Sequence, residues 1–575
     1  MKLLTTILLL ALLNAAVAQL PVTRFEQSKG KQTPAYHEII DWWKKADAAS
    51  AKINMITMGA TDAGYPLLLV VISNTGAADF QKIRKENKLV ILVNNGIHPG
   101  EPDGIDASML LAKDIISGKI KLSDKVVLAI IPVYNIGGCL NRSENYRVDQ
   151  NGPEAFGFRG NAQNLDLNRD FIKADSKNAF AFTQIFHLTN PDILIDNHVS
   201  NGADYQHVMT LLTSQHSKLG GAMGDYLHKT MEPALYSSMQ QKGYDLVPYV
   251  NFDHNDKVEN GWEGFWDAPR YSSGYATLWN TFAFMPETHM LKPYRQRVQS
   301  TYALMQSFIE FANSRISEIK SLRQQAVDEV KNKNDFPVAW QLNKSRFTSI
   351  LFKGYESGYK NSEVSGLPGL YYDRTKPYAK QVPFYNFYDV TASVKKPKAY
   401  IIPQGWWKVV ERLKANDVEM HPFKNDTAIK VEVYRIESYK SSPRPYEGHH
   451  PNSDVQISSS QQVIHFRKGD WWIPMNQEAN RFLIETLEPV GEDAYFAWNF
   501  FDAVLQQKEG YSDYHFEDIA AGYLKSNPGL QAELQAKRRQ DTAFAKSADA
   551  QLNFVFKNSP WIEPAYLAYP VYRVN

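Results

Sequence analysis

The sequence predicts an α/β fold, with a mixed but mostly parallel sheet and helices on both faces, followed by an α+β domain. Two observations lead to this prediction. Short runs of almost continuous aliphatic residues alternate with segments of helical period, which is typical of strands buried on both faces between helices. Beyond residue 335 the pattern changes to short strands and turns, before amphipathic helices return. A chain of 575 residues is also several times the usual domain size, so more than one domain is expected.

The elements of the first part follow from these runs. A stretch such as Pro66–Ile72, PLLLVVI, is short and aliphatic, and a glycine-bearing turn precedes it, so it predicts a buried strand. Strands are expected on the same grounds at 53–58, 66–72, 89–94, 125–133 and 192–196. Helical periodicity predicts helices at 36–48, 105–113, 177–188 and 294–331.

The long helix ends in the segment KNKNDFP, and we place a domain boundary there. This predicts a first domain at 19–335 and an accessory α+β domain of unknown role at 336–575. In the second domain we expect strands at 399–403 and 429–433, and helices at 476–487, 495–508 and 516–525.

The first 18 residues have the features of a signal peptide. One lysine precedes an apolar core from Leu3 to Leu13, and Ala16-Val17-Ala18 supplies the small residues of a cleavage site. The apolar run is too short to span a bilayer, and no other stretch approaches about 18 apolar residues. We therefore expect a protein without a membrane span, exported to the periplasm or the medium after cleavage near Ala18.

The composition excludes some classes of partner. With 63 basic and 62 acidic residues the formal net charge is +1, so no basic excess is available to neutralise nucleic-acid phosphates. Peptides or aminoacyl compounds are the expected partners, and the sequence carries no signal for an oligomeric state. Cys139 is the only cysteine, so no intrachain disulfide can form. An exported chain without disulfides suits a bacterial periplasm or medium.

The segment NNGIHPGEPDG, residues 94–104, joins a predicted strand to a predicted helix. A turn there needs glycine and proline, but it does not need His98 or Glu101. The simplest explanation of Glu101 is an acidic residue placed favourably at a helix N-terminus. The alternative is that His98 and Glu101 act together in a site.

Three further polar motifs favour the second explanation, because each lies in a turn or after an aliphatic run. Asp196-Asn197-His198 closes a predicted strand, and Glu287 follows the apolar run FAFMP. The third motif, Asp166-Leu167-Asn168-Arg169-Asp170, lies between Glu101 and Asp196, with Arg159 upstream of it.

This ordered set resembles the zinc carboxypeptidase family over roughly residues 53–293. The resemblance implies a zinc carboxypeptidase-like fold and one zinc ion held by His98, Glu101 and His198. Two nitrogen ligands and one carboxylate leave a fourth position for water, as catalytic zinc sites require. His207 and His216 are rival third ligands.

The resemblance also implies roles for the central motif. Asp166 would orient a ligating imidazole from outside the ligand set. Asn168 and Arg169 would bind the substrate's terminal carboxylate, which suits the planar guanidinium. The structural alternative for Arg169 is an ion pair with Asp166 or Asp170.

By the same resemblance, Arg159 would stabilise the oxyanion of the tetrahedral intermediate, with Arg142 and Arg147 as competitors. Glu287 would be the general base, and its alternative is an acid at a helix start after Pro286.

A substrate-closing tyrosine is harder to assign. Tyr275 is our choice, and Tyr271 is the other candidate.

The sequence therefore predicts an exported zinc metallocarboxypeptidase, a metalloprotease that hydrolyses C-terminal peptide bonds with metal-activated water. One alternative is a zinc amidohydrolase that resembles the aspartoacylase and succinylglutamate desuccinylase group, which shares several of these motifs. The other is a metal-free binding protein on the same scaffold.

Overall fold

The computed structural model describes residues 20–251 and 257–575, and the predicted signal peptide at 1–18 lies outside them. The contacts between residues divide the chain into two units. The first comprises Met1–Val394, Lys414–Asp417 and Glu478–Phe482, and the second comprises Lys395–Leu413, Val418–Gln477 and Leu483–Asn575. Residues 336–394 therefore pack with the first unit, whereas a catalytic domain that ends at residue 335 stays a prediction.

The first unit is built on a mixed sheet in the order β1-β2-β4-β3-β7-β12-β9-β10, with β8 beside β12. The pairs β3/β4, β3/β7, β7/β12 and β8/β12 are parallel, and β1/β2, β2/β4 and β9/β12 are antiparallel. The strands are β1 (Ile53–Ala60), β2 (Pro66–Ser73), β3 (Leu89–Asn94), β4 (Val126–Ile131), β7 (Ile193–Asp196), β8 (His198–Ser200), β9 (Met209–Thr213), β10 (Val247–Pro248) and β12 (Phe282–His289). The five strands predicted for this part all form, and the mixed α/β class is confirmed.

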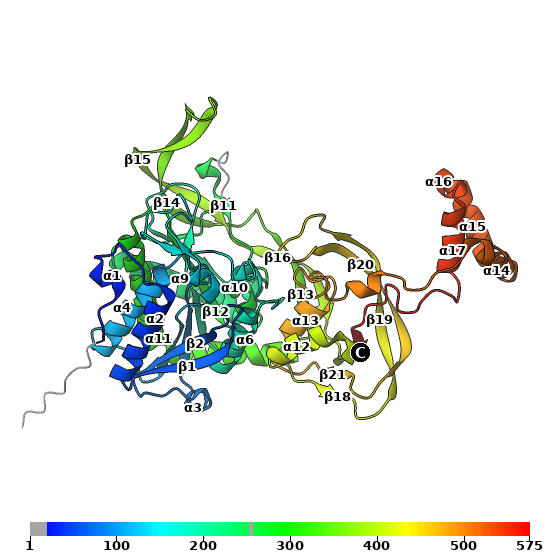
Figure 1. The fold of residues 1–575 in the computed structure, drawn as a ribbon, viewed down its shortest axis with the longest axis horizontal. Coiled ribbons are helices and arrows are strands. Elements are labelled where there is room, and N and C mark those ends of the chain that lie inside the picture. Colours follow the sequence, from blue (N-terminus) through cyan, green and yellow to red (C-terminus); the bar gives the residue numbers. More distant parts are fainter. Residues whose placement is uncertain (1–19, 252–256) are drawn as a thin grey trace, which may run out of the picture. The chain divides into compact units, whose positions relative to one another are not determined.

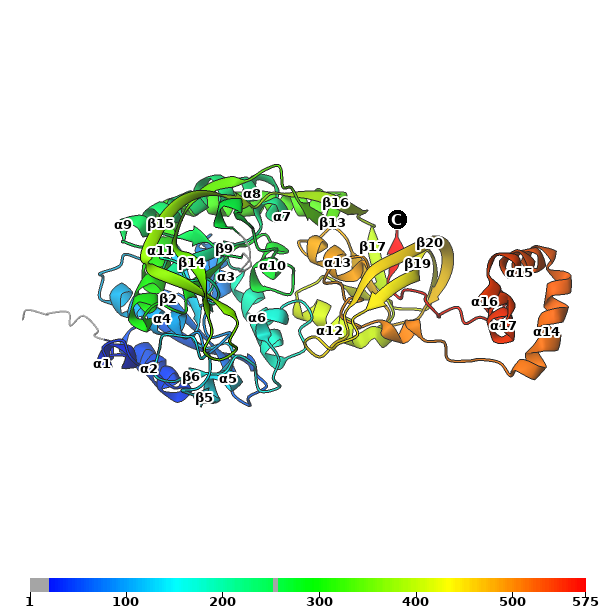
Figure 2. The ribbon, with the colours of Figure 1, turned by 90° about the horizontal axis from the view of Figure 1, so that it is seen from above.

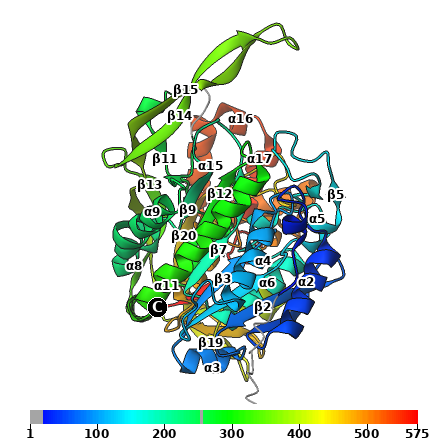
Figure 3. The same ribbon diagram turned by 90° about the vertical axis from the view of Figure 1, so that its left-hand side faces the viewer.

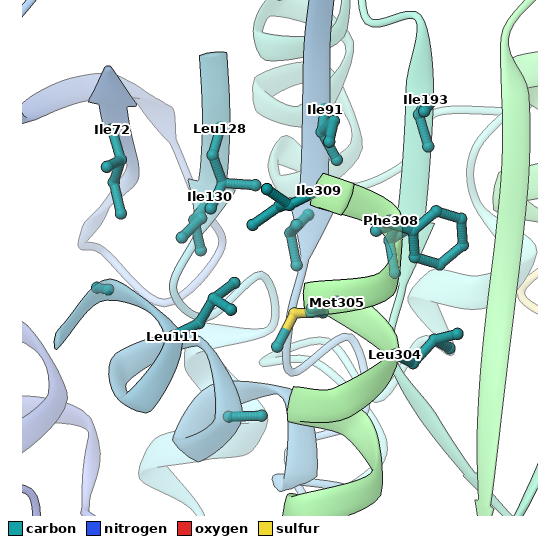
Figure 4. Packing of buried hydrophobic residues seen from close by; sticks show 14 of the residues in the cluster. Ile72, Ile91, Leu111, Leu128, Ile130, Ile193, Leu304, Met305, Phe308 and Ile309 are labelled. Carbon is teal, nitrogen blue, oxygen red and sulfur yellow. The ribbon is translucent and has the colours of Figure 1, made fainter. Parts of the chain in front are cut away.

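Two long helices cover one face of the sheet. The helix α11 (Tyr294–Asn332) crosses the strands, as Figure 3 shows, and packs beside α4 (Asp103–Ile116). Figure 4 shows Ile309 of α11 beside Ile130 of β4, Phe308 beside Ile193 of β7, and Met305 toward Leu111 of α4. The helices α2 (Tyr36–Ala49), α8 (Gly221–Tyr226) and α9 (Glu232–Gln241) join the same core.

The other face is covered by α6 (Lys177–Thr189) and α10 (Ser272–Thr277). Aromatic rings fill this layer: Tyr275 of α10 lies 5.2 Å from Phe186 and 6.1 Å from Phe171, measured between ring centroids. Since successive residues of a strand point to opposite faces, burial on both sides explains the continuous aliphatic runs of the sequence.

Smaller elements complete the first unit. Figure 1 shows β14 and β15 as a long hairpin that extends beyond the helices of this unit. The remaining helices and strands are α1 (Arg24–Gln27), α3 (Phe80–Lys85), α5 (Ile136–Leu140), α7 (His216–Leu219), β5 (Arg142–Ser143), β6 (Phe156–Gly157), β11 (Trp262–Glu263), β13 (Asp335–Leu342), β14 (Thr348–Asn361), β15 (Pro368–Tyr385) and β16 (Tyr388–Lys395).

The second unit contains a six-stranded sheet in the order β18-β21-β17-β22-β19-β20. Its strands β19 and β20 form a long curved hairpin (Figure 2). The elements are β17 (Ala399–Ile402), β18 (His421–Pro422), β19 (Thr427–Ser441), β20 (Asn452–Phe466), β21 (Trp471–Pro474), β22 (Tyr572–Val574), α12 (Trp407–Ala415), α13 (Asn480–Leu487), α14 (Asp513–Ser526), α15 (Pro528–Gln540), α16 (Thr542–Ala545) and α17 (Ala548–Lys557).

One predicted helix of the second part, 495–508, is wrong. Only a short 3-10 turn forms there, at Asp502–Leu505. Asn499 has a left-handed backbone with φ +62°, which interrupts an α-helix. The aromatic residues that suggested a helical face are buried on several sides instead, among them Tyr495, Trp498 and Phe501.

Across the described ranges, no helix is both long enough and apolar enough to cross a membrane.

Candidate metal centre

The turn after β3 brings His98 and Glu101 together. The Glu101 amide donates to the His98 carbonyl at 2.8 Å, which closes a tight turn before α4. Gly96 enters this turn with φ +64°, a conformation that glycine adopts at no steric cost. Gly100 must also lack a side chain, because a Cβ there would lie 2.7 Å from Cδ of Arg147. The side chains of His98 and Glu101 are buried, with 2% and 3% of their surface exposed.

The neighbouring strands place His198 opposite Glu287. In the parallel pair of β8 and β12, these two residues are direct partners. The partner of β12 changes from β7 to β8 between Phe284 and Glu287. Pro286, which has no N–H to donate, lies within that gap, and this explains a proline inside a central strand.

His98, Glu101 and His198 converge on one point. The Nδ1 atoms of His98 and His198 each lie 3.2 Å from Oε2 of Glu101. One ligand atom from each residue lies within 4.8 Å of the others, and this is the group among the described residues that could hold a metal ion.

The opposite edges of both imidazoles face carboxylates. Nε2 of His98 lies 2.9 Å from Oδ1 of Asp166, and Nε2 of His198 lies 3.2 Å from Oδ2 of Asp196. An Nε2–H held by a carboxylate leaves the Nδ1 lone pair free for a metal, so the donor set fits zinc. Asp196 belongs to the polar motif recognised in the sequence, but no role beside His198 was predicted for it.

Two arginines lie on the other side of Glu101. Nη1 of Arg147 is 2.7 Å from Oε1 of Glu101, and Nη1 of Arg159 is 3.6 Å from the same oxygen. Burial alone would raise the pKa of Glu101, but the charges of Arg147 and His98 hold it well below its ordinary value. Arg142 is directed elsewhere, since it donates to the backbone carbonyls of Thr33 and Pro34.

Glu287 keeps part of its side chain exposed, whereas the other residues of β12 are buried. Removal of the carboxylate from water raises its pKa to about 7, and the charge of Glu101 adds to the rise while His198 opposes it. A carboxylate with a pKa near neutrality is suited to proton transfer.

The Asp166–Arg169 segment forms a short 3-10 turn. Asp166 begins the turn and accepts a hydrogen bond from the Asn168 amide at 2.9 Å. Its Oδ2 lies 2.8 Å from Nη2 of Arg159 and 3.9 Å from Nη1 of Arg169. The guanidinium of Arg169 covers the ring of Tyr271 at 4.7 Å, and Oδ1 of Asn168 is buried without a hydrogen-bond partner within the described part of the chain.

The rival ligands are not brought to the centre. Both ring nitrogens of His207 are used, at 3.0 Å from the Asp245 carbonyl and 3.1 Å from the Lys353 amide. The ring of His216 stacks on His228 with 4.3 Å between the centroids.

The two tyrosines of interest differ in position. Tyr275 is fully buried in the aromatic layer beneath the sheet, with its hydroxyl 3.3 Å from His187, so its place in a substrate site stays a prediction. Tyr249, which the sequence analysis missed, lies near the centre. Burial raises the pKa of its phenol, and the negative charges of Glu287 and Glu101 contribute to the rise. The sequence around Tyr249 carries no motif that could have singled it out.

Residues 39–255 match the family model described as zinc carboxypeptidase. Over these residues, which include His98, Glu101 and His198, the chain is similar to the zinc carboxypeptidase family. The chain is 20% identical to Carboxypeptidase 2 of Trichophyton rubrum over 426 residues, which are 71% of this chain and 73% of that one. It is equally similar, at 20% over 427 residues, to Carboxypeptidase 2 of Trichophyton tonsurans, again over 71% and 73% of the two chains.

Two solved structures are also similar to this chain. Carboxypeptidase A from Helicoverpa armigera is 14% identical, with a TM-score of 0.35 over 51% of this chain and 73% of that chain. A metallo-carboxypeptidase from Burkholderia cenocepacia is 15% identical, with a TM-score of 0.36 over 48% and 69%.

The family match over residues 39–255 and the carboxypeptidase relatives support a zinc-dependent metallocarboxypeptidase, a peptide hydrolase. The amidohydrolase and the metal-free alternatives are therefore not favoured.

Proposed function

We propose that this chain removes C-terminal residues from peptides with one zinc ion, held by His98, Glu101 and His198. The observation that carries the proposal is the convergence of both Nδ1 atoms on Oε2 of Glu101, at 3.2 Å each, directly opposite Glu287. Zinc bound there supplies Lewis acidity, which polarises a carbonyl and brings the pKa of water to about 7.

The chain's own residues carry the proton transfers. Glu287 takes a proton from the attacking water at its carboxylate and later delivers it to the nitrogen of the leaving amine. Its raised pKa of about 7 suits both steps, because the group must accept and release a proton near neutral pH. Asp166 holds the Nε2–H of His98 and fixes the orientation of that ring, and Oδ2 of Asp196 lies 3.2 Å from Nε2 of His198 as a charged neighbour.

Other residues bind the substrate and the charge that develops on it. Arg159, 45% of whose side chain is exposed, is available to the oxyanion of the tetrahedral intermediate. Asn168 and Arg169 bind the terminal carboxylate, and the buried unpaired Oδ1 of Asn168 is available to a substrate donor. We assign the substrate-facing tyrosine to Tyr249 in preference to the fully buried Tyr275, because Tyr249 bonds to Leu211 of β9, which pairs with Pro286 beside Glu287.

We further propose that the protein is exported, on the basis of the signal-peptide pattern of residues 1–18. N-terminal sequencing of protein recovered outside the cytoplasm tests this proposal. A mature terminus at Gln19 supports it, and an intact Met1 in the recovered protein contradicts it.

The decisive experiment compares wild type with Glu287→Gln on matched preparations. Metal content is measured by mass spectrometry, and a mixed peptide library reports which end is cut. We expect one zinc per chain in both proteins, C-terminal trimming by wild type, and loss of about two to four orders of magnitude in kcat for the variant. Zinc without trimming of any peptide would contradict the assigned activity, and protein without zinc would contradict the metal site.

A further inference from the structure

The β14–β15 hairpin begins beyond residue 335 and outside the segment that matches the family model, yet it contacts the loop next to the metal centre. That loop, residues 204–207, follows β8, the strand that begins with His198. The contact lies wholly within the first unit. It raises the question of whether the hairpin contributes to the active site.

Backbone pairing joins the loop to the hairpin. Tyr205 and Gly354 form an antiparallel bridge, and the Gln206 amide donates to the Lys353 carbonyl at 2.9 Å. The side-chain amide of Gln206 donates to two more carbonyls, those of Gly354 at 2.9 Å and Tyr378 at 3.0 Å. Gln206 therefore contacts both strands of the hairpin.

An ion pair adds a second attachment. Nε of Arg374 lies 2.6 Å from Oδ2 of Asp204, whose side chain is only 8% exposed. The register shifts where Tyr355 pairs with Pro377 and Glu356 with Asp373, so residues 374–376 are extra residues on β15. A β-bulge of this kind redirects a side chain, and here it accompanies the contact between Arg374 and Asp204.

Tyr205 connects this loop to the strand that carries Glu287. Its ring stacks on His289 of β12, with 4.2 Å between centroids. Its ring centroid also lies 5.9 Å from that of Phe352 of β14. Its hydroxyl lies 3.4 Å from Oγ of Ser200. His289 lies two residues after Glu287 on β12, so the two side chains point to the same face of that strand.

The base of the hairpin also borders a cavity of about 500 Å³ in the first unit. Ile350, Leu351 and Phe384 of the hairpin line it together with Leu212 of β9 and Tyr249. The Tyr249 amide donates to the Leu211 carbonyl at 3.3 Å, and Leu211 pairs with Pro286, the residue before Glu287. The hairpin thus reaches the surroundings of the metal centre by two routes.

We propose that the β14–β15 hairpin is a positioning element of the active site, which holds residues 204–207 so that Tyr205 packs against β12 beside Glu287. The inference rests on the proposed peptidase function for its catalytic consequence, but the positioning itself is independent of activity. It implies that residues 348–385 belong to the working unit of the enzyme. A chain ending at residue 335 would lack this support.

The test uses the full-length, zinc-loaded protein with two substitutions, Gln206→Ala and Arg374→Ala. The matched control is Gln381→Ala with Lys376→Ala: Lys376 is an exposed cation of the same strand that pairs with Asp373, and Gln381 bonds to Ser349. Hydrogen–deuterium exchange of residues 200–210 and 282–290 is measured first. We expect exchange about tenfold faster than in the control in both segments, with residues 89–101 unchanged.

Kinetics on a peptide substrate follow. For the Gln206→Ala/Arg374→Ala protein we expect kcat to fall about tenfold with zinc content unchanged, because small misplacements near the reacting groups are costly. The single variant Arg374→Lys should retain most of the wild-type kcat. Unchanged exchange in both segments would overturn the inference, whether or not the protein is active. A loss of kcat in the control as large as in the Gln206→Ala/Arg374→Ala protein would also overturn it. Faster exchange in a protein that cleaves no peptide would leave the hairpin's role supported and refute the peptidase proposal alone.

Discussion

Arg297 is a buried residue that connects several segments next to the metal centre. Its replacement by methionine should destabilise the first unit strongly. Its side chain is fully buried. Nε and Nη2 donate to the two oxygens of Asp103 at 3.0 and 3.4 Å. Nη1 and Nη2 also donate to four backbone carbonyls, those of Asn151, Gly152, Met290 and Lys292, at 2.9 to 3.2 Å. One residue therefore joins the start of α4, the 151–152 loop and the segment after β12.

The magnitude follows from what the variant leaves behind. Asp103 is 1% exposed, so Arg297→Met leaves a buried carboxylate without its cation, at a cost of about 3–5 kcal/mol. The methionine fills part of the vacated volume but has no hydrogen-bond donor for the four carbonyl oxygens. We expect the free energy of unfolding to fall by about 4 kcal/mol.

Cys139 offers a local reporter for this measurement. It is the only thiol of the chain, it lies in the first unit, and it is 4% exposed. The urea concentration at which it becomes accessible to a thiol reagent gives the midpoint for that unit. Arg315→Met, on the same helix but with an exposed side chain paired to Glu318, is the control and should change stability by less than about 1 kcal/mol.

A double variant separates the ion pair from packing. Asp103→Asn in the Arg297→Met background removes the orphaned charge, so it should recover at least about 1 kcal/mol relative to the single variant. The reasoning would be refuted by a loss below about 1 kcal/mol for Arg297→Met, or by a double variant less stable than the single one.

Two further predictions concern the pH dependence of stability and the affinity for zinc. Burial raises the pKa of the Asp106 carboxyl from the ordinary 3.8 to about 7, so the folded state keeps a proton that the unfolded state loses. The free energy of unfolding therefore falls by about 4 kcal/mol as the pH rises from about 4 to 7. The variant Asp106→Asn still accepts a hydrogen bond from the Tyr294 hydroxyl. In urea unfolding it should be more stable than wild type at about pH 8 and equal to it below about pH 4. Parallel curves of stability against pH for the two proteins would contradict this. Asp166→Asn should weaken zinc binding about 10- to 100-fold in competition with a chelating dye, because Asp166 holds Nε2 of His98 at 2.9 Å, and a change below about twofold would exclude that role.

Local features of the chain were predictable because they depend on neighbours in the sequence. Continuous aliphatic runs identified β3, β4 and β7, and helical periodicity identified α6 and α11 within one or two residues of their observed ends. The turn with His98 and Glu101 is closed by bonds within its own few residues. The helix predicted at 495–508 does not form, because an amphipathic pattern of aromatic residues does not distinguish a helical face from a buried irregular segment.

What the sequence by itself determined was the α/β class, the family resemblance and a short set of polar residues at strand ends and turns. Only the tertiary structure decided which of these residues meet: it paired Glu287 with His198, placed Asp196 behind His198, and directed Arg147, but not Arg142, to Glu101. It also brought Tyr249 and the β14–β15 hairpin to the surroundings of the centre. The reason is physical: these contacts join residues dozens to hundreds of positions apart, so they depend on strand order and on the path of the loops, which no local pattern specifies.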